Sequence, residues 1–156
     1  MKLINGGVCA PLGFKANGIH CGIRKNRVKR DLALIVSEKI CNAGAVYTTN
    51  LVKGAPLTVT KSHLSNGKAQ AVICNSGNAN TCNANGIEIA EEMSALIASA
   101  TGLNPNDIIV ASTGVIGQPL NIEPIKNGMD ALVSGLDENN GEFCAEAIMT
   151  TDTIKK

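Results

Sequence analysis

The sequence contains no tryptophan, one tyrosine and two phenylalanines among its 156 residues. Its 14 Lys and Arg side chains nearly balance its 13 Asp and Glu side chains, which leaves a formal net charge of +1. Proteins that bind nucleic acid commonly combine a cationic surface with aromatic side chains on which bases stack. The scarcity of both features argues against a nucleic-acid partner.

Long apolar runs are missing as well. No stretch approaches the roughly 20 apolar residues that a membrane-spanning helix needs, and the first residues lack the apolar centre of a secretion signal. We therefore expect a cytoplasmic protein without membrane contact, in which the six cysteines are free thiols. The cysteines form no CxxC pair and the two histidines, His20 and His63, are far apart in the sequence, which argues against a metal site.

Hydrophobic residues make up 44% of the chain, which is enough for the core of one domain over residues 1–156. Short runs of β-branched and apolar residues predict strands at 31–37, 44–49, 55–60, 69–74 and 107–112. Apolar residues at helical spacing predict helices at 87–101, 122–136 and 141–149. Strands and helices that alternate in this way predict a layered α/β fold.

Residues 74–86 form an Asn-rich segment with five Asn and two Gly in thirteen positions. Such a composition disfavours regular structure, because Asn and Gly tolerate positive φ and Asn side chains bond to nearby backbone. The segment is either a polar loop that faces a ligand or a loop held together by its own hydrogen bonds. It matches neither of the glycine-rich patterns that bind phosphate.

A turn follows the predicted strand at 107–112, and Thr113 and Gly114 lie in it. A Thr hydroxyl beside a Gly N–H can donate two hydrogen bonds to one oxygen, which is what an oxyanion hole requires. The alternative interpretation is an ordinary turn at the end of a strand.

Two further segments carry polar side chains. The hydroxyls of Thr150, Thr151 and Thr153 could bind a carboxylate or an amide, although Thr is also common in strands. The basic run 24–30 could hold an anion, but without aromatic neighbours a solvated loop is the more ordinary interpretation. Neither cysteine of the Asn-rich segment has an adjacent base, which argues against a cysteine nucleophile.

Six short segments, taken together and in this order, resemble the N-terminal half of the ornithine acetyltransferase family, also called glutamate N-acetyltransferase, an enzyme of arginine biosynthesis. They lie at 13–20, 45–50, 55–57, 75–80, 112–117 and 146–153. Among them are Asn-Ser-Gly-Asn-Ala-Asn at 75–80, Ser-Thr-Gly-Val-Ile-Gly at 112–117 and Thr-Thr-Asp-Thr at 150–153. The six segments are spread over essentially the whole length of the chain, from residue 13 to residue 153.

The resemblance implies a precursor that cuts itself at an internal Thr into an α chain and a β chain. The new N-terminal Thr of β is the nucleophile, which takes acetyl from N-acetylornithine and passes it to glutamate. On this sequence the family's oxyanion hole falls on Thr113 and Gly114, and a substrate-binding Thr falls on Thr150. No metal or organic cofactor is implied, with acetyl-CoA as an optional co-substrate.

The resemblance also implies the fold and the partners. The family has a layered α/β sandwich of mixed sheets and helices, similar to that of a self-cleaving aminopeptidase family, and a second chain completes it. We expect this chain to be the α chain or an N-terminal fragment, to pair with β and to form an α2β2 assembly. The family's cleavage region does not appear before Lys156, so the chain alone is expected to be inactive.

Two other functions stay open on the sequence alone. The first is a self-cleaving aminopeptidase, a hydrolase on a similar fold, which the segments 112–117 and 150–153 disfavour. The second is a binding module without catalytic activity that uses the Asn-rich segment. Such a module would fold and bind alone as a monomer, whereas an isolated α chain would expose apolar surface and sheet edge.

Overall fold

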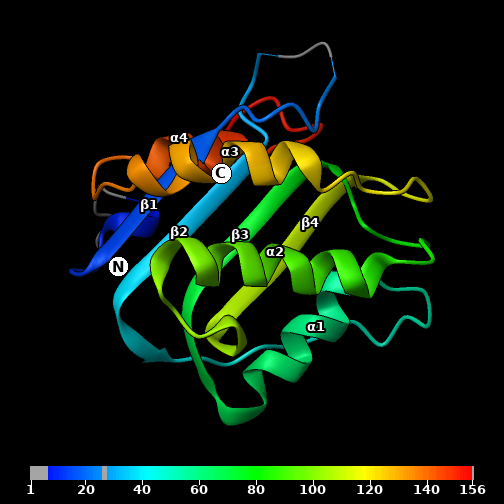
Figure 1. Ribbon diagram of the computed structural model, residues 1–156, viewed down its shortest axis with the longest axis horizontal. Coiled ribbons are helices and arrows are strands. Elements are labelled where there is room, and N and C mark those ends of the chain that lie inside the picture. Colours follow the sequence, from blue (N-terminus) through cyan, green and yellow to red (C-terminus); the bar gives the residue numbers. More distant parts are fainter. Residues whose placement is uncertain (1–6, 26–27, 156) are drawn as a thin grey trace.

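The computed structural model describes residues 7–25 and 28–155. Within them, four strands form one sheet in the order β1-β2-β3-β4 (Figure 1). The strands are β1 (Phe14–Ile19), β2 (Leu32–Asn42), β3 (Lys68–Asn78) and β4 (Ile108–Val115). β2 runs antiparallel to both β1 and β3, whereas β3 and β4 are parallel. This mixed sheet with its helices confirms the layered α/β fold.

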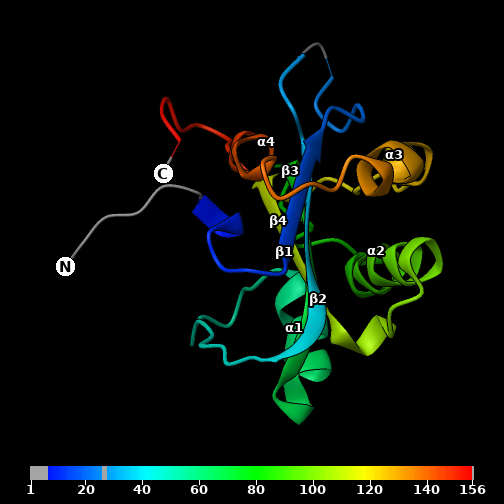
Figure 2. The ribbon, with the colours of Figure 1, turned by 90° about the vertical axis from the view of Figure 1, so that its left-hand side faces the viewer.

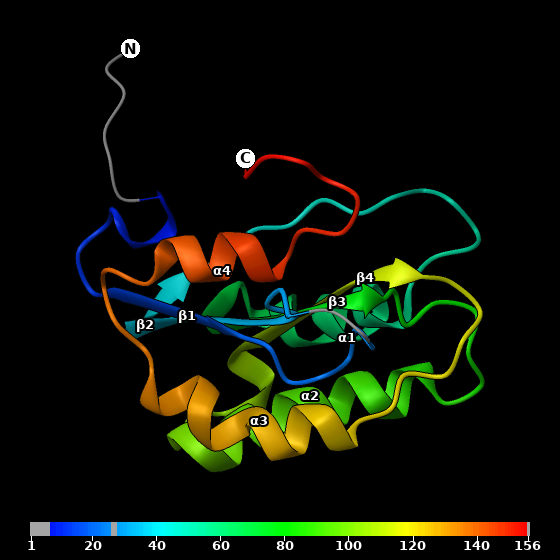
Figure 3. The ribbon, with the colours of Figure 1, turned by 90° about the horizontal axis from the view of Figure 1, so that it is seen from above.

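Helices cover the two faces of the sheet unequally. α2 (Gly86–Thr101) connects β3 to β4 and packs with α3 (Glu123–Ser134) on one face, while α4 (Gly141–Ala147) lies on the other (Figure 2, Figure 3). α1 (Ala55–His63) lies beside β4. Three short 3-10 turns span Gly7–Cys9, Leu64–Asn66 and Pro105–Asp107. None of the helices in the described residues is long and apolar enough to cross a membrane.

The large core lies between the sheet and the helices α2 and α3. Side chains alternate along a strand, so Ala71 and Ile73 of β3 are buried in this core while Val72 and Cys74 face the other side and are only half-buried. Apolar residues spaced three or four apart on the helices complete it. From α2 and α3 these are Ile89, Ala90, Met93, Ile97, Ile125, Met129 and Leu132.

A second, smaller cluster lies on the opposite face under α4. It consists of small residues, with Ala16 and Ala33 from the sheet and Cys144 and Ala147 from the helix. Gly18 of β1 allows the close approach of α4, because a Cβ at this position would collide with the backbone carbonyl of Phe143. Backbone therefore packs on backbone here, and α4 is held close to the β1–β2 part of the sheet.

On both outer strands of the sheet, side chains or loops bind backbone groups of the strand. On β4, the Thr60 hydroxyl of α1 donates to the Val110 carbonyl at 2.9 Å and accepts from the Val110 N–H at 3.1 Å. The ring Nδ1 of His63 donates to the Ile108 carbonyl at 2.8 Å. On β1, Ala16 exchanges two backbone hydrogen bonds with Asp137, at 3.1 and 3.2 Å. These contacts satisfy backbone groups that would otherwise be free to pair with another chain.

Two strand predictions are wrong, and one strand was missed. Residues 44–49 are irregular, and residues 55–60 belong to α1. The β-branched residues of 55–60 favour a strand, but Pro56 lies in the first turn of α1, where proline needs no hydrogen-bond partner and its fixed φ suits a helix. β1 was not predicted, because Asn17 and Gly18 are poor strand formers and only pairing with β2 makes them extended.

Candidate active site

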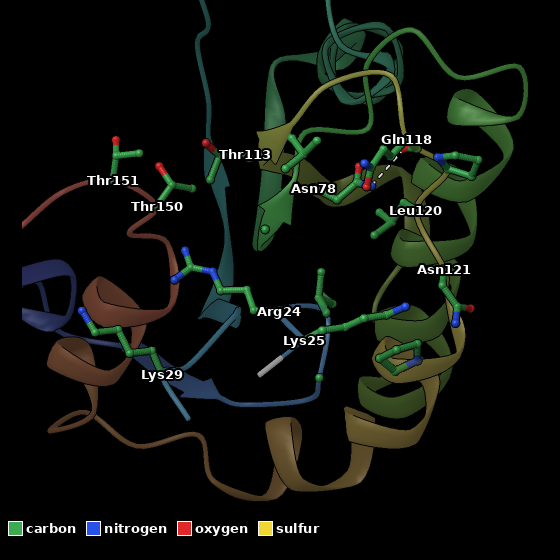
Figure 4. A pocket seen from close by; sticks show the side chains of 17 residues that line it. Arg24, Lys25, Lys29, Asn78, Thr113, Gln118, Leu120, Asn121, Thr150 and Thr151 are labelled. Atoms are coloured by element: carbon green, nitrogen blue, oxygen red, sulfur yellow. Dashed lines mark hydrogen bonds between the residues drawn. The ribbon is translucent and has the colours of Figure 1, made fainter. Parts of the chain in front are cut away.

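A pocket of about 960 Å³ lies at the carboxyl ends of the parallel strands β3 and β4 (Figure 4). Three separate segments converge on it: the loop after β1, the carboxyl ends of the two strands with the segment that follows β4, and the segment after α4. The lining residues are 22–25, 29, 77–78, 113–115, 118–121, 124 and 150–151. The pocket therefore brings together Thr113, Gly114 and Thr150, the three residues singled out from the sequence.

The turn at Thr113 and Gly114 is shaped by a pair of glycines. Gly77 of β3 pairs with Gly114 of β4, and the register shifts at the next residue, Asn78. Both glycines have positive φ, at +105° for Gly77 and +135° for Gly114. A Cβ on Gly114 would lie 2.6 Å from the Asn78 backbone nitrogen. Only glycine fits this close, irregular pairing, and such irregularities re-aim backbone groups next to active sites.

The Asn-rich segment is more regular than its composition suggests. Residues 74–78 continue β3 to its end, so the prediction of irregular structure is wrong for this half. The Asn75 side chain donates to the Asn78 carbonyl at 2.9 Å and accepts from the Ser112 hydroxyl at 2.6 Å. The Asn80 side chain donates to the Gly86 carbonyl at 2.8 Å. These buried amides bind the protein itself, which favours the self-bonded interpretation of the segment.

Asn78 is the member of this segment that reaches the pocket. Its amide nitrogen donates to the Gln118 carbonyl at 2.9 Å, and its amide oxygen accepts from the Asn80 N–H at 2.8 Å. Both ends of the amide are thus engaged, which fixes its orientation. Asn78 therefore connects the turn after β4 to the end of β3 by a hydrogen bond.

Part of the basic run lines the pocket: Arg24, Lys25 and Lys29 do so, although Lys25 and Lys29 remain exposed to solvent, and residues 26 and 27 lie outside the described residues. Asp31 is fully buried and its carboxylate accepts three backbone N–H groups, from Cys21 at 2.7 Å, Gly22 at 3.2 Å and Arg24 at 3.0 Å. His20 adds a contact from Nδ1 to the same carboxylate at 3.1 Å. The turn that results places Arg24 in the pocket lining. In the sequence, the signal for this turn was a single Asp directly before an apolar strand.

Arg30 and Glu146 hold the end of α4, which precedes Thr150. Arg30 Nη1 lies 2.6 Å from Glu146 Oε2, and the guanidinium lies 3.9 Å from the centre of the Phe143 ring. Burial by itself would raise the pKa of Glu146, but hydrogen bonds and charge from Arg30 outweigh it and lower that pKa. The Ser76 hydroxyl also donates to the Ala147 carbonyl, which joins the helix end to β3.

The cysteines near the site are poor nucleophiles. Burial, with the neighbouring Cys144, raises the pKa of Cys74 to about 12. Burial and then the charge of Asp31 raise the pKa of Cys21 to about 12. A thiol reacts as its thiolate, so these groups are inert near neutral pH. Within residues 7–25 and 28–155, no three His, Cys, Asp or Glu side chains are grouped so that they could hold a metal ion.

Comparison with known proteins identifies the family. The sequence model of the ArgJ family matches residues 15–156. The chain belongs to the ArgJ family. The arginine biosynthesis bifunctional proteins ArgJ of Caldanaerobacter subterraneus subsp. tengcongensis and Symbiobacterium thermophilum are 43% and 47% identical to it over its whole length. The chain spans 38% and 39% of these two ArgJ proteins, about two fifths of their length.

Solved ArgJ structures share the fold. The arginine biosynthesis bifunctional protein ArgJ of Bacillus halodurans superposes with a TM-score of 0.90 at 39% identity, over 99% of this chain and 81% of that one. The ornithine acetyltransferase of Mycobacterium tuberculosis, solved in complex with ornithine, also gives a TM-score of 0.90, at 35% identity over 97% and 83% of the two chains. The family resemblance drawn from the short segments is thereby confirmed.

Proposed function

We propose that this chain forms one wall of an acetyltransferase active site and supplies the donors that stabilise a tetrahedral oxyanion. The enzyme would move acetyl from N-acetylornithine to glutamate, with its nucleophile on the part of the family sequence that the chain does not span. One observation carries the proposal: Thr113, Gly114 and Thr150, which derive from distant parts of the sequence, line one pocket. The family assignment favours this reaction over an aminopeptidase or a binding module.

The reaction proceeds in two steps that share one pocket. In the first step the hydroxyl of a β-chain Thr attacks the acetyl carbonyl of N-acetylornithine, with the amino terminus of that Thr as base. Negative charge gathers on the carbonyl oxygen, and the Thr113 hydroxyl and the Gly114 N–H donate to it. Collapse of the tetrahedral intermediate breaks the amide C–N bond, releases ornithine and leaves an acetyl ester on the Thr. In the second step the glutamate amine attacks this ester, which returns the free Thr and gives N-acetylglutamate.

The lengths of the matched proteins support a partner chain. This chain spans 81% and 83% of the two solved chains but 38% and 39% of two curated relatives, so each solved chain is about half as long as a complete relative. We propose that the family sequence is divided into an α and a β chain, assembled as α2β2. No cofactor takes part in the proposed steps, and acetyl-CoA would act only as an alternative acetyl donor.

The decisive test removes one oxyanion donor. In the complete enzyme, meaning this chain together with the rest of the family sequence, Thr113→Ala should lower kcat roughly 10²–10³-fold, since each such donor acts mainly in the transition state. Thr113→Ser keeps the hydroxyl and serves as the matched control, with kcat within a few fold of the parent. An unchanged kcat in Thr113→Ala would remove Thr113 from the mechanism.

A further inference from the structure

One nitrogen of Arg24 lacks any partner in the described part of the chain. The Arg24 side chain lines the pocket, and its Nη2 atom is shielded from solvent without a hydrogen bond to any described residue. A buried guanidinium nitrogen without a partner is unfavourable, because it has lost its hydrogen bonds to water and has gained none to the protein. Arg24 Nη2 can therefore still donate a hydrogen bond, and it is suited to an acceptor atom that does not belong to the described residues.

The protein holds the backbone of Arg24 and the first part of its side chain. The backbone of Arg24 is held by the Asp31 carboxylate through the 3.0 Å hydrogen bond described above. The stem then crosses Gly77, where a Cβ would lie only 2.8 Å from Arg24 Cγ. Figure 4 shows the guanidinium on the side of the pocket lined by Thr113, Thr150 and Thr151, whereas Lys25 extends the other way, toward Asn121. The backbone and the start of the Arg24 side chain are thus positioned before any ligand binds.

The charge around the pocket selects an anion. Among the described residues that line it, the charged ones are Arg24, Lys25 and Lys29, all cations, although the whole chain has a net charge of only +1. Lys25 and Lys29 are exposed and raise the local concentration of anions, while Arg24 is half-buried and offers a planar fork that matches a carboxylate. The site therefore has one directional anchor and two attracting charges.

The chemistry of the proposed reaction decides which anion this is. Donor and acceptor occupy the pocket in turn, and their side chains carry opposite charges, an ammonium in ornithine and a carboxylate in glutamate. An arginine can favour both substrates only through the group that they share, the α-carboxylate next to the reacting nitrogen. We propose that Arg24 binds the α-carboxylate of both substrates and so orients the amine or amide toward Thr113 and Gly114. This inference rests on the proposed function.

The test compares substrates with and without the carboxylate. In the complete enzyme, Arg24→Gln should raise KM for N-acetylornithine and for glutamate roughly 10- to 100-fold with kcat within a few fold, which is the effect of one lost charge-assisted hydrogen bond. Ornithine and putrescine, which differ by this carboxylate, are then compared as competitive inhibitors. The inhibition constant for ornithine should rise by the same factor, and that for putrescine should stay within twofold.

Two variants serve as controls. Lys39→Gln removes the same charge from an exposed position outside the pocket and should change KM by less than about threefold. Arg24→Lys keeps the charge but loses the fork, and we expect a KM between those of the parent and Arg24→Gln. Should Arg24→Gln fail to fold, Arg24→Lys carries the same comparison of ornithine with putrescine.

Three results would overturn the proposal. Equal weakening of ornithine and putrescine would show that Arg24 holds a carboxylate of the protein instead. A raised KM for acetyl-CoA alone would assign Arg24 to phosphate groups, and an unchanged KM for all substrates would remove it from the pocket's function. If the parent enzyme transfers no acetyl group, the proposed function fails, and calorimetric titration of N-acetylornithine into the parent and Arg24→Gln still tests the anchor.

Discussion

The two faces of the sheet differ in how completely this chain covers them. The face under α2 and α3 is a closed core in which Leu34, Ile73 and Ile108 are fully buried. On the opposite face α4, seven residues long, covers mainly β1 and β2. Ile35, Val72 and Ile109 lie in register across β2, β3 and β4 on that face and are only half-buried.

The contrast separates the side of the strands that this chain covers by itself from the side that it leaves half-covered. The closed face supplies the chain's own hydrophobic stabilisation, whereas the half-covered apolar row on the α4 side gains little from this chain alone. The irregular segment 43–54 also runs on the α4 side (Figure 3), and its Val46, Leu51 and Val52 are exposed. We propose that the remaining family sequence packs against this face and completes the sandwich.

The largest expected effect separates two neighbouring isoleucines of β4. Ile108→Ala should lower the free energy of unfolding by about 2–5 kcal/mol, because it opens a cavity in the closed core. Ile109→Ala makes the same chemical change on the half-covered face and should cost about 1 kcal/mol in the isolated chain. Urea unfolding measures both.

The same pair can break the comparison in the complete enzyme. If the rest of the family sequence covers the α4 face, Ile109→Ala should there approach the 2–5 kcal/mol of a buried position, while the cost of Ile108→Ala stays unchanged. An equal cost of Ile109→Ala in the isolated chain and in the complete enzyme would contradict a covered face.

A smaller effect is expected where α4 meets β1. Gly18→Ala introduces a Cβ that collides with the Phe143 carbonyl and should destabilise the fold by about 1–3 kcal/mol. Because Thr150 follows α4, acetyl transfer should fall as well. Gly44→Ala, at a glycine with open space around it, is the control and should leave the melting temperature unchanged. Full activity in Gly18→Ala would show that the position of α4 does not matter to the pocket.

The smallest effect concerns the Arg30–Glu146 pair at the other end of α4. The pKa of Glu146 is lowered in the folded state, so this pair stabilises the protein above the pKa of an unfolded glutamate, about 4.3. The contribution should be lost as the pH falls below that value and through the lowered pKa of the folded state. The parent should therefore be more stable than Glu146→Gln at pH 6, and the two should converge near pH 3. A difference that stays constant with pH would contradict the ion pair.

The sequence was most informative where one element decides its own structure. The three helices were predicted because their apolar residues recur at helical spacing, and Ile125, Met129 and Leu132 of α3 lie in the core as expected. β1 and α1 were missed because tertiary contacts decide them. Extended backbone at Asn17 and Gly18 depends on β2, and the helix at 55–63 is stabilised by contacts of its Thr60 with β4.

The candidate site divides in the same way. The family resemblance singled out Thr113, Gly114 and Thr150, and the structure brings these three to one pocket. Arg24 was noted only as part of a basic run that could hold an anion, and its place in the pocket could not be predicted, because that place depends on a hydrogen bond to the buried Asp31, seven positions later. A long-range hydrogen bond of this kind leaves no periodic pattern in a sequence.

The helix beside β4 constrains how any partner can attach. Thr60 and His63 already use the outward backbone groups of Val110 and Ile108. An incoming strand could align with this stretch only by displacing α1 and its buried Val59. Pairing of a further strand with this stretch of β4 is therefore blocked, which leaves the half-covered face under α4 as the surface on which we expect a second layer to pack.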